Sequence, residues 1–164
     1  MNILAKSQEK NLEQCPKLPA QCVLDLAWGN RLTEEHFVAM HEFPEFMKQP
    51  VNRIASGSQA TPGVEGYVFD GADASQMAFW TCRESAASAP HTHEFDEYMV
   101  VVEGCYTLIL YRANVGEERK AIRAGEECLI PRGVRHGGEV VAGTRTIHAF
   151  GGHRANRIQE RANH

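Results

Sequence analysis

The chain has 164 residues, of which 43% are hydrophobic, and this is enough for one compact domain with a sizeable core. A formal net charge of −4 offers no basic patch for nucleic acid and no polybasic anchor for a membrane. No apolar run reaches transmembrane length and no signal peptide is recognisable, so the sequence predicts a cytoplasmic protein without nucleic-acid or membrane partners.

The five cysteines are Cys15, Cys22, Cys82, Cys105 and Cys128. Their number is odd, and their spacing matches neither a disulfide framework nor a zinc site. In a cytoplasmic protein this pattern predicts reduced thiols. The last three lie in apolar runs that resemble strands, where cysteine is most simply a small core residue.

Residues 1–49 are predicted to form an N-terminal extension that contains a short helix. Thr33 suits the N-cap, two glutamates follow in the first turn, and Phe37 and Met40 begin an apolar stripe. Pro44 is expected to kink or end this helix. We expect the extension to pack on the main domain or on a partner subunit.

Residues 50–153 carry a pattern of short strands separated by turn residues, and residues 154–164 form a charged tail. Strands are expected near residues 67–69, 76–83, 98–102, 105–111, 117–123, 128–130 and 144–150. This pattern is typical of an all-β barrel or two-sheet jelly roll. In the second strand, Ala78 and Trp80 share one face and Met77 and Phe79 the other; the sequence does not say which face lines a pocket.

The first group of metal-ligand residues lies between Pro90 and Gly104. His91 and His93 are two residues apart, so in an extended chain their imidazoles point the same way. A fully extended chain would carry Glu97 roughly 20 Å from His91, too far for shared ligand bonds of about 2 Å. The chain must therefore turn at residues 94–96, and a new strand then carries Glu97, Met99 and Val101 on one face.

A second group lies between Gly125 and His136. A short buried strand is followed by Pro131-Arg132-Gly133, a turn that ends it, and His136 comes just after that turn. We predict that His91, His93, Glu97 and His136 bind one divalent metal ion inside the barrel. The alternative is that these residues are core histidines and a solvated charge.

These two groups resemble the two motifs of the cupin superfamily. His91-Thr92-His93, Glu97 and Gly104 match the first motif in order and spacing, and Gly125, Pro131, Gly133 and His136 match the second. Two positions depart from the usual pattern: Ser85 stands where the family usually has glycine, and Val140 where it often has asparagine. Neither position is a metal ligand in the pattern.

The resemblance covers residues 85–140 and implies a small single-domain cupin of the cupin-2 type, a double-stranded β-helix barrel. Cupins commonly pair as dimers, which implies a homodimer here. Three imidazoles and a carboxylate leave two open positions on an octahedral ion, and such ligands suit Fe, Mn, Ni, Co, Cu or Zn without choosing among them.

Three functions stay open at this point. Two adjacent open positions favour a small polar organic substrate that binds through two atoms. Iron with O2 would give a dioxygenase-like oxidoreductase, whereas a metal acting as a Lewis acid would give an isomerase, lyase or hydrolase. The third function is small-molecule binding without catalysis, which also occurs in the family.

His148 is the candidate catalytic residue. It shares one face of the last predicted strand with Thr146 and Phe150, and an inward face would let it act as a general base or hydrogen-bond a substrate. A structural histidine is the alternative. Arg132 and Arg135 flank Gly133 and could attract an anionic substrate, or could be solvated charges at the rim.

Overall fold

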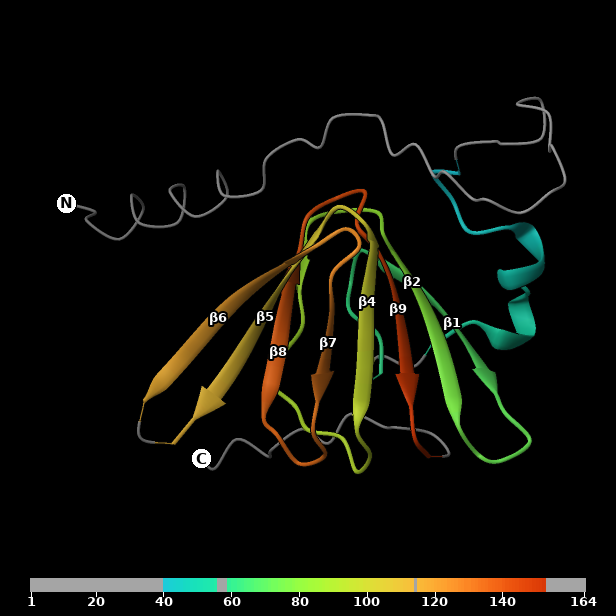
Figure 1. Cartoon of the computed structure of the whole chain (residues 1–164). Helices are drawn as coiled ribbons and strands as arrows, with labels where there is room; N and C mark the ends of the chain where they lie inside the picture. Colours follow the sequence, from blue (N-terminus) through green and yellow to red (C-terminus); the bar gives the residue numbers. More distant parts are fainter. Residues whose placement is uncertain (1–39, 56–58, 114, 153–164) are drawn as a thin grey trace, which may run out of the picture. The chain divides into compact units, whose positions relative to one another are not determined.

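A computed structural model describes residues 40–55, 59–113 and 115–152 (Figure 1). Most of the predicted N-terminal helix therefore lies outside the described residues. The part that is described, residues 40–43, is not helical. It leads into two short 3-10 helices, η3 (Glu45–Met47) and η4 (Pro50–Asn52). Pro44 is the N-cap of η3, so it precedes a helical turn and does not end one.

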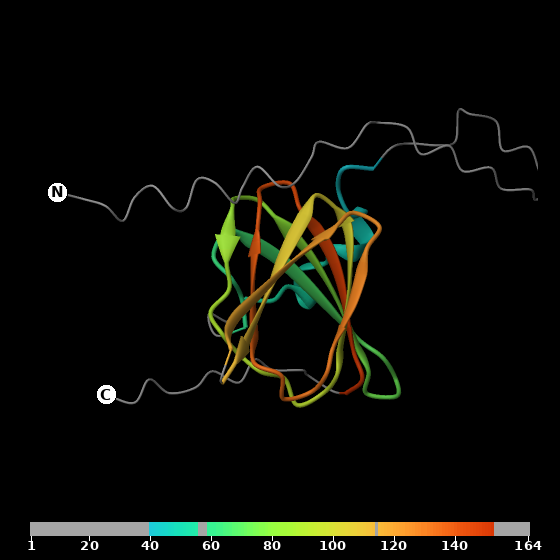
Figure 2. The ribbon, with the colours of Figure 1, turned by 60° about the vertical axis from the view of Figure 1, so that its left-hand side comes forward.

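The predicted all-β architecture is confirmed: within the described ranges the strands form two antiparallel sheets and no α-helix occurs. The strands are β1 (Val64–Asp70), β2 (Gln76–Cys82), β3 (Ala86–Ala87), β4 (Glu97–Glu103), β5 (Cys105–Arg112), β6 (Gly116–Arg123), β7 (Glu127–Ile130), β8 (His136–Val140) and β9 (Arg145–Phe150). One sheet has the order β1-β2-β9-β4-β7 and the other the order β3-β8-β5-β6. The turned view shows the strands curving round into a barrel (Figure 2).

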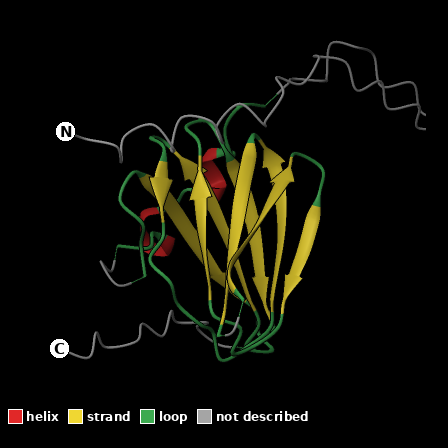
Figure 3. Ribbon diagram, turned by 90° about the vertical axis from the view of Figure 1, so that its left-hand side faces the viewer, coloured by secondary structure: helices red, strands yellow, loops and turns green. Residues whose placement is uncertain are grey.

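Figure 3 shows how strands dominate the described fold, with the two short helices beside them. Ion pairs attach the described end of the extension to the barrel. The guanidinium of Arg83 binds Glu42 at 2.5 Å and Glu65 on β1 at 2.8 Å. Next to it, the ring of Phe43 packs edge-on against Phe79 of β2 at 5.5 Å. Residues 42 and 43 are thereby fixed on the outer face of the five-stranded sheet.

The core lies between the two sheets and follows the alternation predicted for β4. Met99 and Val101 are fully buried, and Glu97 on the same face is 4% exposed, whereas Tyr98 and Val102 point outward. Met99 and Val101 form the hydrophobic cluster together with Leu108, Ile122 and Ile130. Strand β4 therefore passes from the apolar core to a buried carboxylate within two residues.

Two glycines make room for two aromatic rings inside the barrel. A β-carbon at Gly66 would collide with the ring of Trp80, and one at Gly138 would collide with the ring and hydroxyl of Tyr106. Because Trp80 and Ala78 line the interior while Met77 is exposed, the structure decides which face of β2 is the inner one. A side chain at either glycine would push a ring into the cavity.

The cysteines depart from the prediction at one position. Cys82 and Cys128 are free thiols, but Cys105 is disulfide-bonded, so the prediction that all the thiols are reduced is wrong at Cys105. Burial, with a smaller contribution from the charge of Glu97, raises the pKa of Cys128 to about 11. This thiol therefore stays protonated at neutral pH and has no thiolate reactivity.

Among the described residues, no helix is long and apolar enough to cross a membrane.

Candidate metal centre

The backbone joins the two motifs directly. His91 and His136 form an isolated antiparallel bridge in which each amide donates to the carbonyl of the other, at 2.8 and 2.9 Å. The amide of Gly133 donates to the carbonyl of His93 at 2.9 Å, so the turn after β7 holds the third histidine. The predicted bend before Glu97 is present at residues 94 and 95. Residues 40 or more positions apart thus meet at one point.

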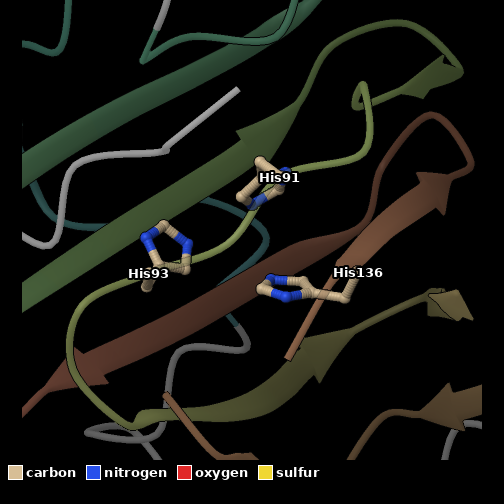
Figure 4. A group of neighbouring side chains, drawn as sticks. All are labelled: His91, His93 and His136. Carbon is tan, nitrogen blue, oxygen red and sulfur yellow. The ribbon is translucent and has the colours of Figure 1, made fainter. Parts of the chain in front are cut away.

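The three histidine rings converge at this point (Figure 4). One ring nitrogen from each of His91, His93 and His136 lies within 4.8 Å of the others, and all three side chains are buried. The prediction that these histidines gather in one place is therefore confirmed. A cluster of three buried imidazoles is a group that could hold a metal ion.

Hydrogen bonds to the backbone fix the orientation of two of the rings. Nδ1 of His91 lies 2.8 Å from the carbonyl oxygen of Ala89, and Nδ1 of His136 lies 2.9 Å from that of Val134. A carbonyl oxygen can only accept, so each Nδ1 carries a proton and donates it. In the neutral ring, Nε2 is then left with a free lone pair, which is the form in which histidine binds metal.

Glu97 lies against the histidines and has one oxygen without a hydrogen bond. Its Oε2 lies 3.2 Å from Nε2 of His136 and 3.4 Å from Nε2 of His93. Two ligands at right angles on an ion with bonds of about 2.1 Å are roughly 3 Å apart, so these separations suit shared coordination. Among the described residues, Oε2 is a buried oxygen with no hydrogen-bond partner. Such an atom is costly unless something binds it, and a cation beside the imidazoles would satisfy it.

The carboxyl group of Glu97 is held in its charged form. Burial by itself raises its pKa, but the neighbouring imidazoles of His136, His148 and His93 lower it by more, and the pKa ends well below its usual range. Glu97 is therefore an ionised carboxylate at neutral pH. A buried carboxylate next to imidazole nitrogens is a donor set that fits a divalent transition metal.

The sequence left open which way the face of β9 that carries His148 points. In the structure it points inward, because Thr146 and His148 are buried and His148 and Phe150 line the cavity. Nδ1 of His148 lies 2.5 Å from Oε1 of Glu97, and its Nε2 lies 2.9 Å from the hydroxyl of Thr146. Both ring nitrogens thus have partners. The proposed role of His148 as a general base is not tested by these contacts.

A cavity of about 280 Å³ opens beside the metal-ligand group. Its wall combines aromatic rings, from Trp80, Tyr106 and Phe150, with polar side chains, from Asn52, Arg53, Gln59, Asp70 and Gln76. The cavity is large enough for a small organic molecule. Within the described residues, Arg53 is the lining side chain with a permanent positive charge.

Sequence reasoning missed the polar part of this wall. Asn52, Arg53 and Gln59 lie outside both motifs, and Arg53 reaches the barrel through an isolated bridge to Tyr67. The two arginines suggested for the rim are placed elsewhere: the Arg132 amide donates to Asp96 at 2.8 Å, and Arg135 stacks on Tyr111 at 5.1 Å. Neither arginine lines the cavity.

Scans of the sequence find no matching family model and no matching curated protein. Many solved structures share the fold. The polyketide cyclase RemF from Streptomyces resistomycificus has a TM-score of 0.55 at 20% identity, covering 68% of this chain and 80% of that one. KdgF from Halomonas sp. has a TM-score of 0.50 at 21% identity, covering 57% and 82%. Oxalate decarboxylase from Bacillus subtilis has a TM-score of 0.54 at 14% identity, covering 63% of this chain and 29% of that one.

At these identities the likeness shows the fold alone, and this chain matches less than a third of the length of the oxalate decarboxylase. The barrel, the three converging histidines and the two sequence motifs nevertheless agree with one another. The comparison therefore shows a fold that this chain shares with these structures, and the cupin resemblance of its two motifs stays a prediction.

Proposed function

We propose that this chain is a cupin and a metal-dependent enzyme that acts on a small polar organic substrate, with His91, His93, Glu97 and His136 as the ligands of one divalent ion. The observation that carries the proposal is the buried Oε2 of Glu97, which lacks a hydrogen bond and lies within 3.4 Å of two imidazole nitrogens. A cavity of about 280 Å³ beside it supplies space for the substrate.

A divalent ion bound there would supply Lewis acidity and open positions for two substrate atoms. The protein's own residues do the rest. The imidazoles of His91 and His136 are held by backbone carbonyls, so they need no reorientation to bind. Trp80, Tyr106 and Phe150 supply apolar wall that excludes water from the substrate, and the polar side chains of the same cavity can hydrogen-bond to it.

Two reaction classes remain within this proposal. A dioxygenase-like oxidoreductase is the one predicted from the sequence, and iron would be its metal. A non-redox lyase or isomerase is the alternative, and it is supported by the names of two structures with this fold, a decarboxylase and a cyclase. A binding protein without turnover would show ligand-dependent thermal stabilisation and no product.

Elemental analysis of protein purified without a His-tag or metal column tests the proposal. About one equivalent of a transition metal per chain is expected, because four ligands specify one ion. Iron together with substrate-dependent oxygen uptake would favour the dioxygenase, and activity retained without oxygen would favour the lyase or isomerase. Absence of metal after reconstitution with Fe, Mn, Ni and Zn salts would contradict the enzyme proposal.

Arg53 is expected to bind an anionic group of the substrate. Replacing Arg53 with leucine should weaken binding of a small dicarboxylate such as malonate by about 10- to 100-fold, since a charge-assisted hydrogen bond contributes about 1.5–3 kcal/mol. Calorimetric titration of the metal-loaded protein would measure this. The matched variant Arg53→Lys should retain most of the affinity, and uncharged malonamide should bind both variants alike. Equal malonate affinity in Arg53→Leu and the wild type would remove Arg53 from the binding site.

The proposed partner is a second copy of the chain. Tyr98 and Leu129 are cross-strand neighbours on the outer face of the five-stranded sheet, and Met77 lies two strands away on the same row; all three are at least 38% exposed. An exposed apolar row of this kind suits an isologous dimer contact. Light scattering should show a dimer that Leu129→Glu dissociates and the control Val115→Glu, outside this row, does not. A wild-type monomer would contradict the prediction. The cytoplasmic location stays a prediction.

A further inference from the structure

The contacts of His148 with Glu97 indicate a role that the proposed function does not include. Nδ1 of His148 lies 2.5 Å from Oε1 of Glu97, and the two side chains are 11% and 5% exposed. Oε2 of the same carboxylate is the oxygen without a hydrogen-bond partner among the described residues. One oxygen is therefore held by a neighbouring strand, and the other is presented to the histidine cluster.

The direction of this hydrogen bond does not depend on the charge of His148. An ionised carboxylate can only accept, so Nδ1 of His148 must carry the proton that it shares with Oε1. Nε2 then either accepts from the Thr146 hydroxyl, 2.9 Å away, or donates to it. In both cases the imidazole is held at both ends and cannot rotate without losing a buried hydrogen bond, which costs about 1–3 kcal/mol.

The backbone register supports the same geometry. His148 pairs with Met99 of β4 on one side and with Ala78 of β2 on the other, so its strand is central in the five-stranded sheet. Glu97 pairs with Phe150, two residues along, which sets His148 diagonally opposite Glu97 on the inner face. The contact is thus fixed by three paired strands.

We propose that His148, supported by Thr146, is a positioning residue: it binds Oε1 of Glu97 and thereby directs Oε2 toward the metal that His91, His93 and His136 would hold. The inference rests on the proposed metal site and adds which residue orients its carboxylate ligand. A free carboxylate rotates about its terminal torsion and can bind an ion through either oxygen or both, whereas this one is preorganised for binding through a single oxygen.

The test uses full-length protein, stripped of metal and titrated with Co(II) alone against a chelator. His148→Leu should weaken Co(II) binding by about 10- to 100-fold and alter the d–d absorption bands, because the carboxylate loses its fixed orientation. His148→Asn places an amide donor near the position of Nδ1 and should recover affinity to within about tenfold of wild type. Thr146→Val should give a smaller loss, because it releases only the far end of the ring.

Thr144→Val is the matched control. Thr144 is a buried threonine whose hydroxyl donates to the carbonyl of Cys105 at 3.1 Å, so its loss costs stability without touching the metal site. The melting temperature of each metal-free variant separates folding from binding. We expect Thr144→Val to melt earlier than wild type and to bind Co(II) with unchanged affinity and an unchanged spectrum.

A second readout needs no metal. Long-range ¹⁵N–¹H correlation spectra of the metal-free protein should show a proton on Nδ1 of His148, and Glu97→Gln should shift that resonance. An unprotonated Nδ1 would overturn the proposal. So would a His148→Leu variant that binds Co(II) with wild-type affinity and spectrum. Failure of the wild-type protein to bind Co(II), Zn(II), Fe(II) or Mn(II) would instead overturn the proposed function, and the role of His148 with it.

Discussion

His136→Ala is expected to lower the affinity for a divalent metal by at least tenfold, and to remove the metal from protein purified without added salt. The side chain of His136 is 3% exposed, its Nδ1 donates to the carbonyl of Val134, and its Nε2 lies 3.2 Å from Oε2 of Glu97. Loss of residues that only support a ligand costs about 10- to 100-fold, so loss of a ligand should cost at least as much. Chelator competition with Zn(II) and elemental analysis measure the effect.

His41→Ala is the matched control for this experiment. The side chain of His41 is 80% exposed, and its contact with Glu103 at 3.4 Å lies away from the cavity lining. Its removal should leave both the metal content and the affinity unchanged. Unchanged metal content in His136→Ala and in His93→Ala would contradict the assignment of these histidines as ligands.

The candidate metal ligands could be predicted from the sequence because most of their spacing is local. A pair of histidines two residues apart, a forced turn and a carboxylate at the start of the next strand can be recognised without knowing how the sheets pair. His136 was found through the turn before it. The structure adds the mutual bridge between His91 and His136, which no spacing rule contains.

The partners of His148 could not be deduced in the same way. Strand parity places His148 on one face with Thr146 and Phe150, but it does not say which way that face points. Which residue His148 meets depends on the register of β9 against β4. A shift of one residue in that register would turn the opposite face of one strand toward the core. Arg53 and Asn52 were missed for a related reason: they reach the cavity from a segment before β1, through one isolated bridge to Tyr67.

Met99→Ala is expected to destabilise the fold by about 2–5 kcal/mol, the usual cost of truncating a large buried side chain to alanine. Met99 is fully buried in the cluster that includes Val101 and Leu108. The neighbouring side chains are tightly packed, so they can fill little of the cavity that the substitution leaves. Urea unfolding of the metal-free protein would measure the free energy. The m-value, which is the slope of the free energy of unfolding against urea concentration, should stay unchanged, because unfolding exposes the same surface.

Met77→Ala is the control, since Met77 is also a strand methionine but is 44% exposed on the outer face of β2. Its loss should change the free energy of unfolding by no more than about 0.5 kcal/mol. The comparison also tests the metal centre, because Met99 and Glu97 share one face of β4. If Met99→Ala cost as little as Met77→Ala, the inward face of β4 would be wrong. Glu97 would then point away from the histidines, and the fourth ligand would have to come from elsewhere.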